Sequence, residues 1–408
     1  MRVIKDIFKD MFGSKVKTDE KKINEILNRG VVAEILPSKE EFVKRLMSGD
    51  KLRIYIGADP TSDSLHLSHA KNYLLLEELR QLGHEVIVLV GDFTAQIGDP
   101  TSKESARTQL TEEQVKKNVK SWIKQIKPLM SFNDRKNPPR IKYNSEWLSK
   151  MSWKDELVLA SNFTVQRMLE RDMFDRRLKN DIPIYFHEFQ YPLMQGYDSV
   201  AMDVDVELCG TDQVFNALVG RTLLKRLKNK NKFVVAVNLM ENPKTKELMS
   251  KSKGTGVFLS SPPKEMFGAI MAQPDEMTEV LFINVTRIPL AEKEKIMSLG
   301  PREAKMLIAQ DIVKKFYGEK EAQKAKDEWE KVFSKKELPE DIKEAPGDNM
   351  KLVDFMTEYV PVASSSEAKR LLDQGAVSVN EGVVKEWGHV LKKGDIVRIG
   401  PRKFLKVS

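Results

Sequence analysis

Apolar residues in the first third of the chain follow two patterns, short continuous runs and a helical spacing. Leu52–Ile56 is a short apolar run that meets Gly57 and a polar stretch. Apolar residues then recur with helical spacing at positions 67, 70, 74, 75 and 79, before a second run at Val86–Val90. This order of strand, helix and strand predicts a parallel sheet, in which a ligand lies at the carboxyl ends of the strands.

Two later passages repeat the pattern of a strand that ends in glycine and polar residues. The first runs from Gly91 to Lys103 and contains Gly-Asp-Pro-Thr at 98–101. The second follows the stretch Val204–Leu208 and reads Cys-Gly-Thr-Asp-Gln. In a parallel sheet such turns meet at one edge, where helix N-terminal N–H groups can face an anion. We therefore expect these turns to share one crevice.

The pattern changes to helices with short loops beyond Ser260. Pro301 opens one such helix and Gly318 closes it. Near the end of the chain, Ser364 and Glu367 have the spacing of a capping box at the start of a helix, and a short hairpin follows. The predicted fold class is α/β, with a Rossmann-like catalytic domain over 1–259, an α-helical domain over 260–337, a linker over 338–350 and a small α+β domain over 351–408.

Composition and charge are those of a globular chain. The 408 residues exceed one ordinary domain, and the net charge of +8 permits an RNA partner without requiring one. Cys209 is the single cysteine, so no intrachain disulfide can form. No apolar run approaches the ~20 residues of a membrane span. Residues 1–17 predict an amphipathic helix that docks on the body, and the expected location is cytoplasmic.

Two polar motifs are ambiguous when each is taken alone. His66 and His69 share one face of the first predicted helical turn, but an isolated pair of this kind is more often an ordinary structural pair. Tyr191, Gln195 and Asp198 line one stripe if their segment is helical, and a surface helix shows the same spacing. Neither motif identifies a site without the other.

Two charged segments have an ordinary interpretation as solvated surface. Four lysines at positions 244, 246, 251 and 253 surround a Leu-Met-Ser-Lys-Ser sequence. Such a loop is normally solvated, although beside a phosphate crevice it can clamp a polyphosphate. The charges of Met168–Lys179 lie on several faces, which predicts a solvated helix.

Taken in order, the motifs resemble the class I tyrosyl-tRNA synthetases of bacterial type. His-Leu-Ser-His at 66–69 matches the family's first signature, His-Ile-Gly-His, and Leu-Met-Ser-Lys-Ser at 248–252 matches the second, Lys-Met-Ser-Lys-Ser. Between them, the turn at 98–101, the Tyr-x-x-x-Gln-x-x-Asp at 191–198 and the Gly-Thr-Asp-Gln at 210–213 follow the family's order. The terminal segment resembles a small S-four-like RNA-binding domain.

The resemblance implies activation of L-tyrosine by ATP to tyrosyl-adenylate and pyrophosphate, then transfer to the 3′ end of tRNA(Tyr). The first step needs donors aimed at phosphate charge, because a carboxylate is already a nucleophile. Mg²⁺ would accompany ATP without a protein-built metal site. The catalytic residues implied are Thr61, His66, His69 and Lys251. The implied ATP-binding residues are Gly57, Asp59, His66, His69, Lys103, Arg107, Asp212, Gln213, Met249, Ser250 and Lys251.

The resemblance also assigns an amino-acid pocket and an RNA surface. Tyr55 and Asp198 match the pair that binds the substrate phenol, and the group around its ammonium matches Asp99, Tyr191 and Gln195. Buried polar groups set for a hydroxyl penalise phenylalanine, which would leave them unpaired. The family is usually homodimeric, and apolar surface between positions 122 and 194 is available for an interface. The expected RNA-binding residues are Lys369, Arg370, Arg402 and Lys403.

Three positions differ from the family pattern. Ser68 and Cys209 replace glycines, and Leu248 replaces the first lysine of the second signature. These differences leave open a synthetase-like RNA-binding protein with weakened or lost aminoacylation. Another adenylyl-transferring enzyme on the same architecture is a further alternative, although the tyrosine-pocket set argues against it.

Overall fold

The computed structural model describes residues 16–99, 110–249, 255–334, 342–360, 362, 364–380, 382–400 and 403–408. At residues 172, 332–334 and 403 it describes the backbone alone. The chain divides into two compact units, the first ending at Glu319 and the second beginning at Lys320. The helix predicted over 1–17 lies almost wholly outside the described residues. No helix within the described ranges is long and apolar enough to cross a bilayer.

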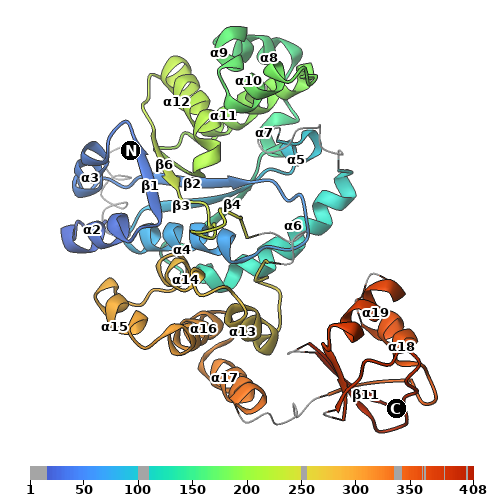
Figure 1. The fold of residues 1–408 in the computed structure, drawn as a ribbon. Coiled ribbons are helices and arrows are strands. Elements are labelled where there is room, and N and C mark those ends of the chain that lie inside the picture. The colour runs from blue at the N-terminus through green and yellow to red at the C-terminus, as the bar shows by residue number, and fades with distance from the viewer. Residues whose placement is uncertain are drawn as a thin grey trace. The chain divides into compact units, whose positions relative to one another are not determined.

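A six-stranded sheet forms the centre of the first unit (Figure 1). Its order is β1-β6-β5-β2-β3-β4, and all neighbouring strands are parallel except β1 and β6. The strands are β1 (Val32–Leu36), β2 (Arg53–Ala58), β3 (Glu85–Val90), β4 (Arg140–Tyr143), β5 (Val206–Gly210) and β6 (Phe233–Val237). The predicted Rossmann-like α/β fold is confirmed, since β2 and β3 pair in parallel around an intervening helix, α4 (Leu67–Gln81).

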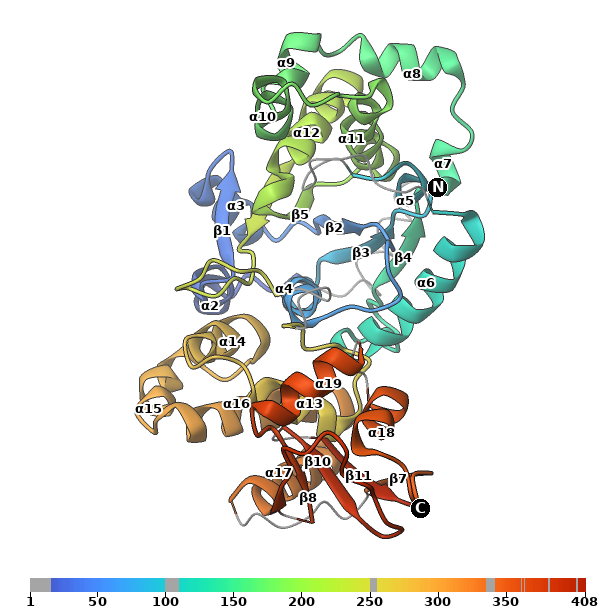
Figure 2. The same ribbon diagram turned by 45° about the vertical axis from the view of Figure 1, so that its right-hand side comes forward.

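Helices cover both faces of this sheet (Figures 1 and 2). Helix α4 packs against β2 and β3 on one face, while α11 (Gln190–Met202) and α12 (Val214–Lys228) lie on the other. Residues 86–90 of β3 are all at most 4% exposed, as expected for a parallel strand buried on both faces. Because β2 lies between β5 and β3, the carboxyl ends of these three strands adjoin.

Two glycines allow α11 and α12 to approach each other closely. A Cβ added to Gly196 would lie 2.9 Å from Cγ1 of Val219, and one added to Gly220 would lie 3.3 Å from Cα of Gly196. Real Cβ atoms essentially never come within 3.0 Å of another residue. The close packing of α11 against α12 therefore requires glycine at both positions. It fixes the position of α11, the helix that carries the predicted tyrosine-binding stripe.

The segment predicted to be a solvated helix contains two buried arginines, so that prediction was wrong for them. Arg171 is 5% exposed and Arg177 is 3% exposed. Arg177 donates two hydrogen bonds to the carboxylate of Glu188, at 2.7 and 3.0 Å. The charge pattern of a helix does not reveal a carboxylate partner that lies later in the chain. The helices here are α8 (Trp153–Ala160), α9 (Val165–Leu169) and α10 (Asp172–Lys179).

The remaining helices of the first unit flank the sheet or follow it. They are α2 (Glu20–Asn28), α3 (Lys39–Met47), α5 (Thr94–Ile97), α6 (Glu112–Ile126), α7 (Ser145–Leu148), α13 (Pro263–Met271), α14 (Met277–Val285), α15 (Lys293–Met297) and α16 (Pro301–Tyr317). The limits of α16 match the prediction. Gly300 and Gly318 flank it with φ of +92° and +85°, in a region that favours glycine.

The second unit contains a sheet of order β7-β11-β10-β8-β9 within the described residues. Its strands are β7 (Lys343–Ala345), β8 (Val377–Val379), β9 (Gly382–Val383), β10 (Ile396–Ile399) and β11 (Lys403–Val407), and its helices are α17 (Glu319–Ser334), α18 (Leu352–Tyr359) and α19 (Ser365–Asp373). Ser364 caps α19 by accepting a hydrogen bond from the backbone of Glu367. Strand β7 falls within the predicted linker and pairs in parallel with β11, so part of that stretch belongs to the sheet.

Candidate active site

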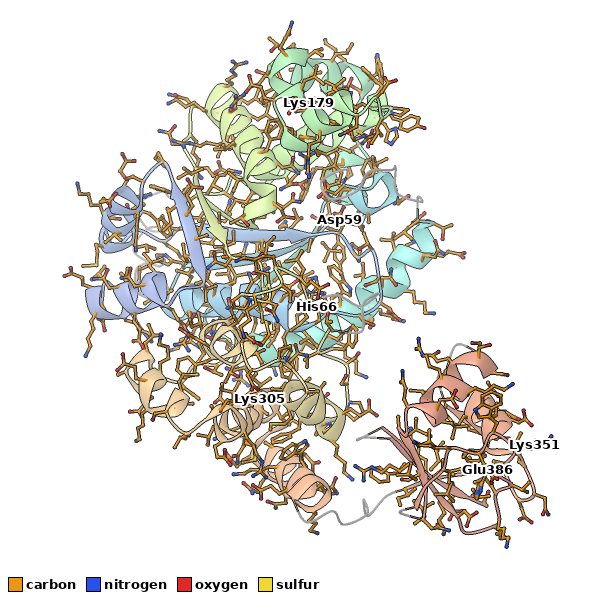
Figure 3. The ribbon with its side chains drawn as sticks, viewed as in Figure 1. Asp59, His66, Lys179, Lys305, Lys351 and Glu386 are labelled. Atoms are coloured by element: carbon orange, nitrogen blue, oxygen red, sulfur yellow. The ribbon has the colours of Figure 1, made fainter. Side chains whose placement is uncertain are left out.

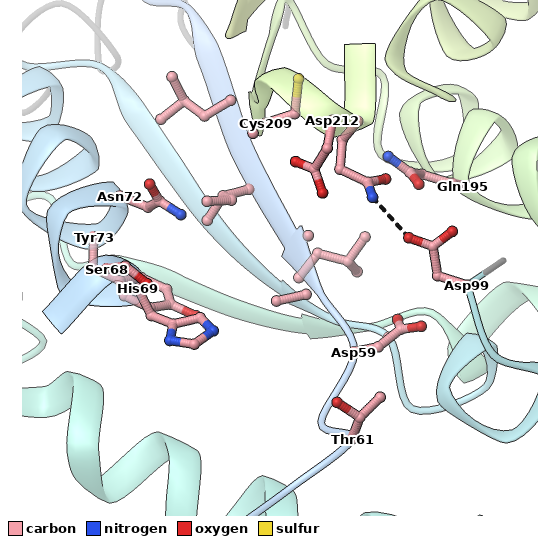
Figure 4. Close-up of a pocket in the computed structure, with 18 of the residues that line it drawn as sticks. Asp59, Thr61, Ser68, His69, Asn72, Tyr73, Asp99, Gln195, Cys209 and Asp212 are labelled. Atoms are coloured by element: carbon pink, nitrogen blue, oxygen red, sulfur yellow. Dashed lines mark hydrogen bonds between the residues drawn. The ribbon is translucent and has the colours of Figure 1, made fainter. Parts of the chain in front are cut away.

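A cavity of about 440 Å³ lies at the carboxyl ends of β2 and β5, beside the first turns of α4 (Figure 4). It brings together residues that are up to 194 positions apart in sequence. The sequence-predicted residues that line it are Tyr55, Gly57, Asp59, Thr61, His66, His69, Asp99, Tyr191, Gln195, Asp198, Asp212, Gln213 and Met249. The predicted Lys103, Arg107, Ser250 and Lys251 lie outside the described residues.

The two histidines of the first signature occupy the start of α4. His66 is the N-cap residue, and its backbone N–H donates to Nδ1 of His69 at 3.2 Å. Their ring centroids are 4.1 Å apart. Burial lowers the pKa of His66 to about 4 and that of His69 to about 3. Both rings are therefore neutral at pH 7, and each retains one N–H donor.

Ser68, which replaces the family glycine, hydrogen-bonds one of these rings. Its Oγ lies 2.7 Å from Nδ1 of His66. When the hydroxyl donates to Nδ1, the single ring hydrogen of the neutral imidazole lies on Nε2. Ser68 is thus compatible with an N–H donor at His66, and it lines the same cavity.

The segments around the two signatures are joined by backbone hydrogen bonds. Leu67 donates to the carbonyl of Val257 at 3.0 Å, and Leu259 donates to the carbonyl of Leu65 at 2.9 Å. Within the second signature, Met249 donates to the carbonyl of Met240 at 3.2 Å. Backbone hydrogen bonds therefore fix the start of the second signature and the residues that follow it beside the cavity, although 250–254 are outside the described residues.

One end of the cavity carries buried groups that suit a phenol. Tyr55 is 1% exposed, and its hydroxyl lies 2.9 Å from Oγ of Ser199. Asp198 is 3% exposed and accepts hydrogen bonds from Nε1 of Trp147 at 2.8 Å and Nδ2 of Asn144 at 3.4 Å. Burial raises the pKa of Asp198 well above its ordinary range, and these two donors oppose that shift.

Asp59 and Asp99 form a second group of carboxylates in the cavity (Figure 4). Asp59 accepts from the hydroxyl of Tyr191 at 2.9 Å, and Asp99 accepts from the amide of Gln213 at 2.7 Å. Arg171 lies 3.4 Å from Asp99. Asp59 and Asp99 supply carboxylate oxygens to which an ammonium group can donate, while the guanidinium of Arg171 balances part of the charge of Asp99.

An amide network connects this group to the rest of the cavity wall. The side-chain amide of Asn216 donates to Oε1 of Gln195 and to Oε1 of Gln213, each at 2.9 Å. Gln195 in turn donates to Glu207 at 3.2 Å. Gln195 on α11 and Gln213 after β5 therefore belong to one hydrogen-bonded network.

Sequence reasoning missed several residues of the cavity. Lys71 is 2% exposed, lines the cavity and donates to Oδ1 of Asn72 at 2.8 Å. Burial lowers its pKa to about 7. Glu207 had a visible signal, since a charged residue inside an apolar strand is unusual. Asn144, which lines the cavity, and Trp147, which contacts Asp198 from outside the lining, had no signal, because only tertiary structure brings them to Asp198.

Cys209 and Leu248 also line the cavity. Cys209 is 6% exposed, and burial raises the pKa of its thiol well above the ordinary value. The side chain of Leu248 is not buried, since the residue is 46% exposed. Neither replacement obstructs the described part of the cavity.

The predicted RNA-binding residues in the second unit are described only in part. Lys369 places its Nζ 5.0 Å from the ring centroid of Trp387, which is 50% exposed. Arg370 lies 3.7 Å from Glu367 with a largely exposed side chain. Arg402 and the side chain of Lys403 lie outside the described structure.

Comparisons with known proteins agree with this architecture. A family model described as "tRNA synthetases class I (W and Y)" matches residues 47–334, and one described as "S4 domain" matches residues 350–397. The chain belongs to the class I tRNA synthetases, a class whose catalytic domain is a Rossmann-like sheet of the kind seen here.

The relatives narrow this class to one family. The tyrosine–tRNA ligase of Carboxydothermus hydrogenoformans is 41% identical over 407 residues, covering 94% of this chain and 97% of that protein. The tyrosine–tRNA ligase of Thermotoga maritima is 40% identical over 394 residues, covering 94% and 96%. Within its class, the chain is a member of the bacterial-type tyrosyl-tRNA synthetases.

Two solved structures support the fold independently. The C-terminally truncated mitochondrial tyrosyl-tRNA synthetase of Aspergillus nidulans matches with a TM-score of 0.66 at 22% identity, covering 76% of this chain and 94% of that chain. The enzyme of Archaeoglobus fulgidus, solved with L-tyrosine, matches with a TM-score of 0.58 at 22% identity, covering 75% and 99%. Similarity at this level of identity concerns the fold alone.

Proposed function

We propose that the protein activates L-tyrosine with ATP and transfers the tyrosyl group to the 3′ end of tRNA(Tyr). The observation that carries the proposal is a single cavity that joins Tyr55 and Asp198 to His66 and His69. One end supplies buried partners for a phenol, and the other supplies neutral N–H donors for phosphate oxygens. The family membership of the chain supports the same activity.

In the activation step, a carboxylate oxygen of tyrosine attacks the α-phosphorus of ATP, and pyrophosphate leaves. No general base is required, so the protein acts by positioning and by stabilising charge on the phosphates. Thr61 and His66 are proposed to donate hydrogen bonds to these oxygens, and His69 to support the nucleotide side. Lys251 is proposed to bind the departing pyrophosphate.

Other residues are proposed to bind the two substrates along the cavity. Lys103, Arg107, Met249 and Ser250 would complete the ATP site beside Gly57. The remaining nucleotide contacts are proposed to come from Asp59, Asp212 and Gln213. The substrate ammonium is proposed to contact Asp99, Tyr191 and Gln195, because they supply a carboxylate, a hydroxyl and an amide to the cavity wall.

Mg²⁺ is proposed to accompany the phosphates of ATP as part of the substrate. Among the described residues, no group of three or more His, Cys, Asp or Glu side chains is placed to bind a metal ion. The S4 domain is proposed to bind the tRNA through Lys369, Arg370, Arg402 and Lys403, where lysine and arginine can neutralise backbone phosphates. An enzyme that uses ATP and tRNA in protein synthesis is proposed to act in the cytoplasm.

A homodimer is proposed, with an interface on α8–α10 and the turn that follows. Large apolar side chains are exposed there on segments that follow one another in the chain, and exposed apolar surface favours association with a second copy. The exposed fractions are 72% for Trp153, 66% for Val165, 55% for Leu178 and 75% for Phe186. Sedimentation equilibrium tests this interface. Phe186→Glu is expected to give monomers, whereas Leu307→Glu on α16 is expected to leave the dimer intact.

Tyrosine-dependent ATP–pyrophosphate exchange tests the activation step. Exchange is expected with tyrosine and not with tryptophan or phenylalanine, and Asp198→Ala is expected to abolish that selectivity. A chain that binds tRNA(Tyr) without any exchange would instead be a synthetase-like RNA-binding protein. Exchange driven by a different acid would indicate another adenylyl-transferring enzyme.

A further inference from the structure

A lysine and a glutamate form a buried ion pair beside the tyrosine end of the cavity. Lys232 immediately precedes β6 and is 1% exposed, while Glu207 lies on β5 and is 2% exposed. The Nζ of Lys232 contacts Oε2 of Glu207. Removing two charges from water is costly, and such a pair often contributes little net stability. Its location suggests a role in the site.

Each member of the pair contacts a residue of the tyrosine end. The Nζ of Lys232 donates to Oγ of Ser199 at 2.7 Å, and Ser199 lies 2.9 Å from the hydroxyl of Tyr55. Oε1 of Glu207 accepts from Nε2 of Gln195 at 3.2 Å. The space for the ammonium exists because residue 220 is glycine. A Cβ at Gly220 would lie 2.7 Å from Nζ.

The charge of Lys232 sets the direction of the hydrogen bonds around Ser199. An ammonium has donors only, so Ser199 must accept from Lys232 and keeps its own hydrogen for another oxygen. The distance to Tyr55 is 2.9 Å, whereas the distance to Oε2 of Glu207 is 3.3 Å. Ser199 also has the geometry to donate to Glu207. Because O–H···O bonds normally span 2.5–3.0 Å, the shorter contact assigns the Ser199 hydrogen to Tyr55.

Tyr55 then keeps its own hydroxyl hydrogen for another acceptor. Within the protein, the acceptor that competes for this hydrogen is Glu207, which also interacts with the Tyr55 hydroxyl. Lys232 contacts one oxygen of that carboxylate and Gln195 the other, so the charge of Glu207 is balanced and its attraction for the Tyr55 hydrogen is weaker. Without the ammonium, Glu207 would be an unpaired buried carboxylate and would attract the hydrogen.

We infer that Lys232 is a positioning residue that makes the Tyr55 hydroxyl a donor toward the phenol oxygen of the substrate, and thereby strengthens discrimination against phenylalanine. This inference rests on the proposed function. The phenol would accept from Tyr55 and donate its own hydrogen to Asp198. Phenylalanine would leave both groups unpaired in a site already arranged for the hydroxyl.

Kinetics of pyrophosphate exchange test the inference. Lys232→Met is expected to raise the KM for tyrosine and to lower the tyrosine-to-phenylalanine ratio of kcat/KM, each by about tenfold, with the KM for ATP unchanged. Lys232→Met with Glu207→Gln removes both charges and leaves no unpaired carboxylate, so it serves if the single variant does not fold. It is expected to lose less selectivity than Lys232→Met, because Ser199 no longer accepts from an ammonium but no carboxylate competes for the Tyr55 hydrogen.

A Tyr55→Phe background separates positioning from a structural effect. If Lys232 acts through the Tyr55 hydroxyl, the substitutions at 232 and 207 are expected to cause no further loss of selectivity in that background. Equal losses in both backgrounds, or unchanged selectivity in the Tyr55 background, would overturn the inference. Lys305→Met is the matched control (Figure 3). Lys305 is a buried lysine on α16, and its Nζ lies 2.7 Å from Oδ1 of Asp275.

The wild-type chain distinguishes failure of this inference from failure of the proposed function. Absence of tyrosine-dependent exchange in the wild type would remove the proposed function, and the inference with it. Normal exchange in the wild type with unchanged selectivity in the Lys232 variants would overturn the inference alone.

Discussion

The indole Nε1 of Trp147 donates a hydrogen bond to Oδ1 of Asp198 at 2.8 Å. Trp147 lies on the short helix α7 and Asp198 on α11, 51 residues later. Because Asp198 is 3% exposed, this donor is one of the few groups that replace the water around its carboxylate. The bond fixes one oxygen of the carboxylate that is proposed to receive the substrate phenol.

Trp147→Phe is expected to raise the KM for tyrosine by about tenfold, since a hydrogen bond to a charged group contributes roughly 1.5 kcal/mol or more. Phenylalanine keeps the aromatic packing and removes the donor. Exchange kinetics at varied tyrosine and ATP measure the effect, and the KM for ATP serves as the internal control. An equal rise in both KM values would indicate general disruption of the cavity.

The neutral histidines predict a specific dependence on pH. The pKa of His66 is about 4 and that of His69 about 3, compared with 6.5 for an ordinary histidine. Exchange activity is therefore expected to show no step from His66 between pH 6 and 8. A step with a midpoint near pH 6.5 in the wild type that is lost in His66→Asn would contradict this prediction.

The same shift affects stability with a defined sign. Below pH 6.5 the unfolded chain binds protons at these positions that the folded chain does not, so the free energy of unfolding falls as the pH decreases toward 3. Denaturant unfolding at several pH values measures the trend. The slope of stability against pH is expected to be smaller in His69→Gln than in the wild type over this range.

The lowered pKa of Lys71 predicts that stability also depends on pH in the neutral to alkaline range. Its pKa is about 7 in the folded chain, against 10.5 for an ordinary lysine. Between these values the unfolded chain holds the extra proton, so the free energy of unfolding rises with pH over this window. Below pH 7 the burial penalty of the charged form is fully present.

Lys71→Met removes this contribution. The variant is expected to be more stable than the wild type at pH 7, and the difference is expected to narrow toward pH 10. Urea unfolding of both chains at pH 7, 8.5 and 10 measures it. A difference that does not change with pH would show that Lys71 is not titrating in this range.

The contact between α11 and α12 predicts a pair of contrasting glycine substitutions. Gly196→Ala is expected to destabilise the chain by about 1–3 kcal/mol, because the new Cβ would lie 2.9 Å from Val219. Gly268→Ala in α13 is the matched control. Apart from its two chain neighbours and the nearby backbone of its own helix, no atom lies within 4 Å of its added Cβ, so it is expected to stabilise the helix by about 0.5–1 kcal/mol. Thermal unfolding of the two variants compares them, and similar shifts would contradict the close contact.

Local patterns predicted the elements that depend on neighbouring residues. The apolar runs around β2 and β3 and the spacing within α4 are properties of short stretches, so the strand–helix–strand unit and its edge were predictable. The stripe of Tyr191, Gln195 and Asp198 followed from helical periodicity, and α11 presents all three to the cavity.

Pairings between distant segments were not predictable in the same way. Strand β5 lies beside β6 only in the folded sheet, so nothing near Glu207 in the sequence indicates Lys232. For Arg171 and Arg177 the prediction of solvent exposure failed because their carboxylate partners, Asp99 and Glu188, come from other segments. Strand β7 is three residues long and pairs with the last strand of the chain, which an acidic, proline-containing sequence does not reveal.

The buried thiol of Cys209 provides a measurement that needs no introduced label. It is the single cysteine in the chain, and its low exposure and raised pKa leave little thiolate in the native state. Because Cys209 lines the cavity, an alkylating reagent should modify the protein slowly, either through the cavity or when β5 separates from its neighbours. The rate of modification then reports access to this wall of the cavity, and ligands that occupy the cavity should slow it.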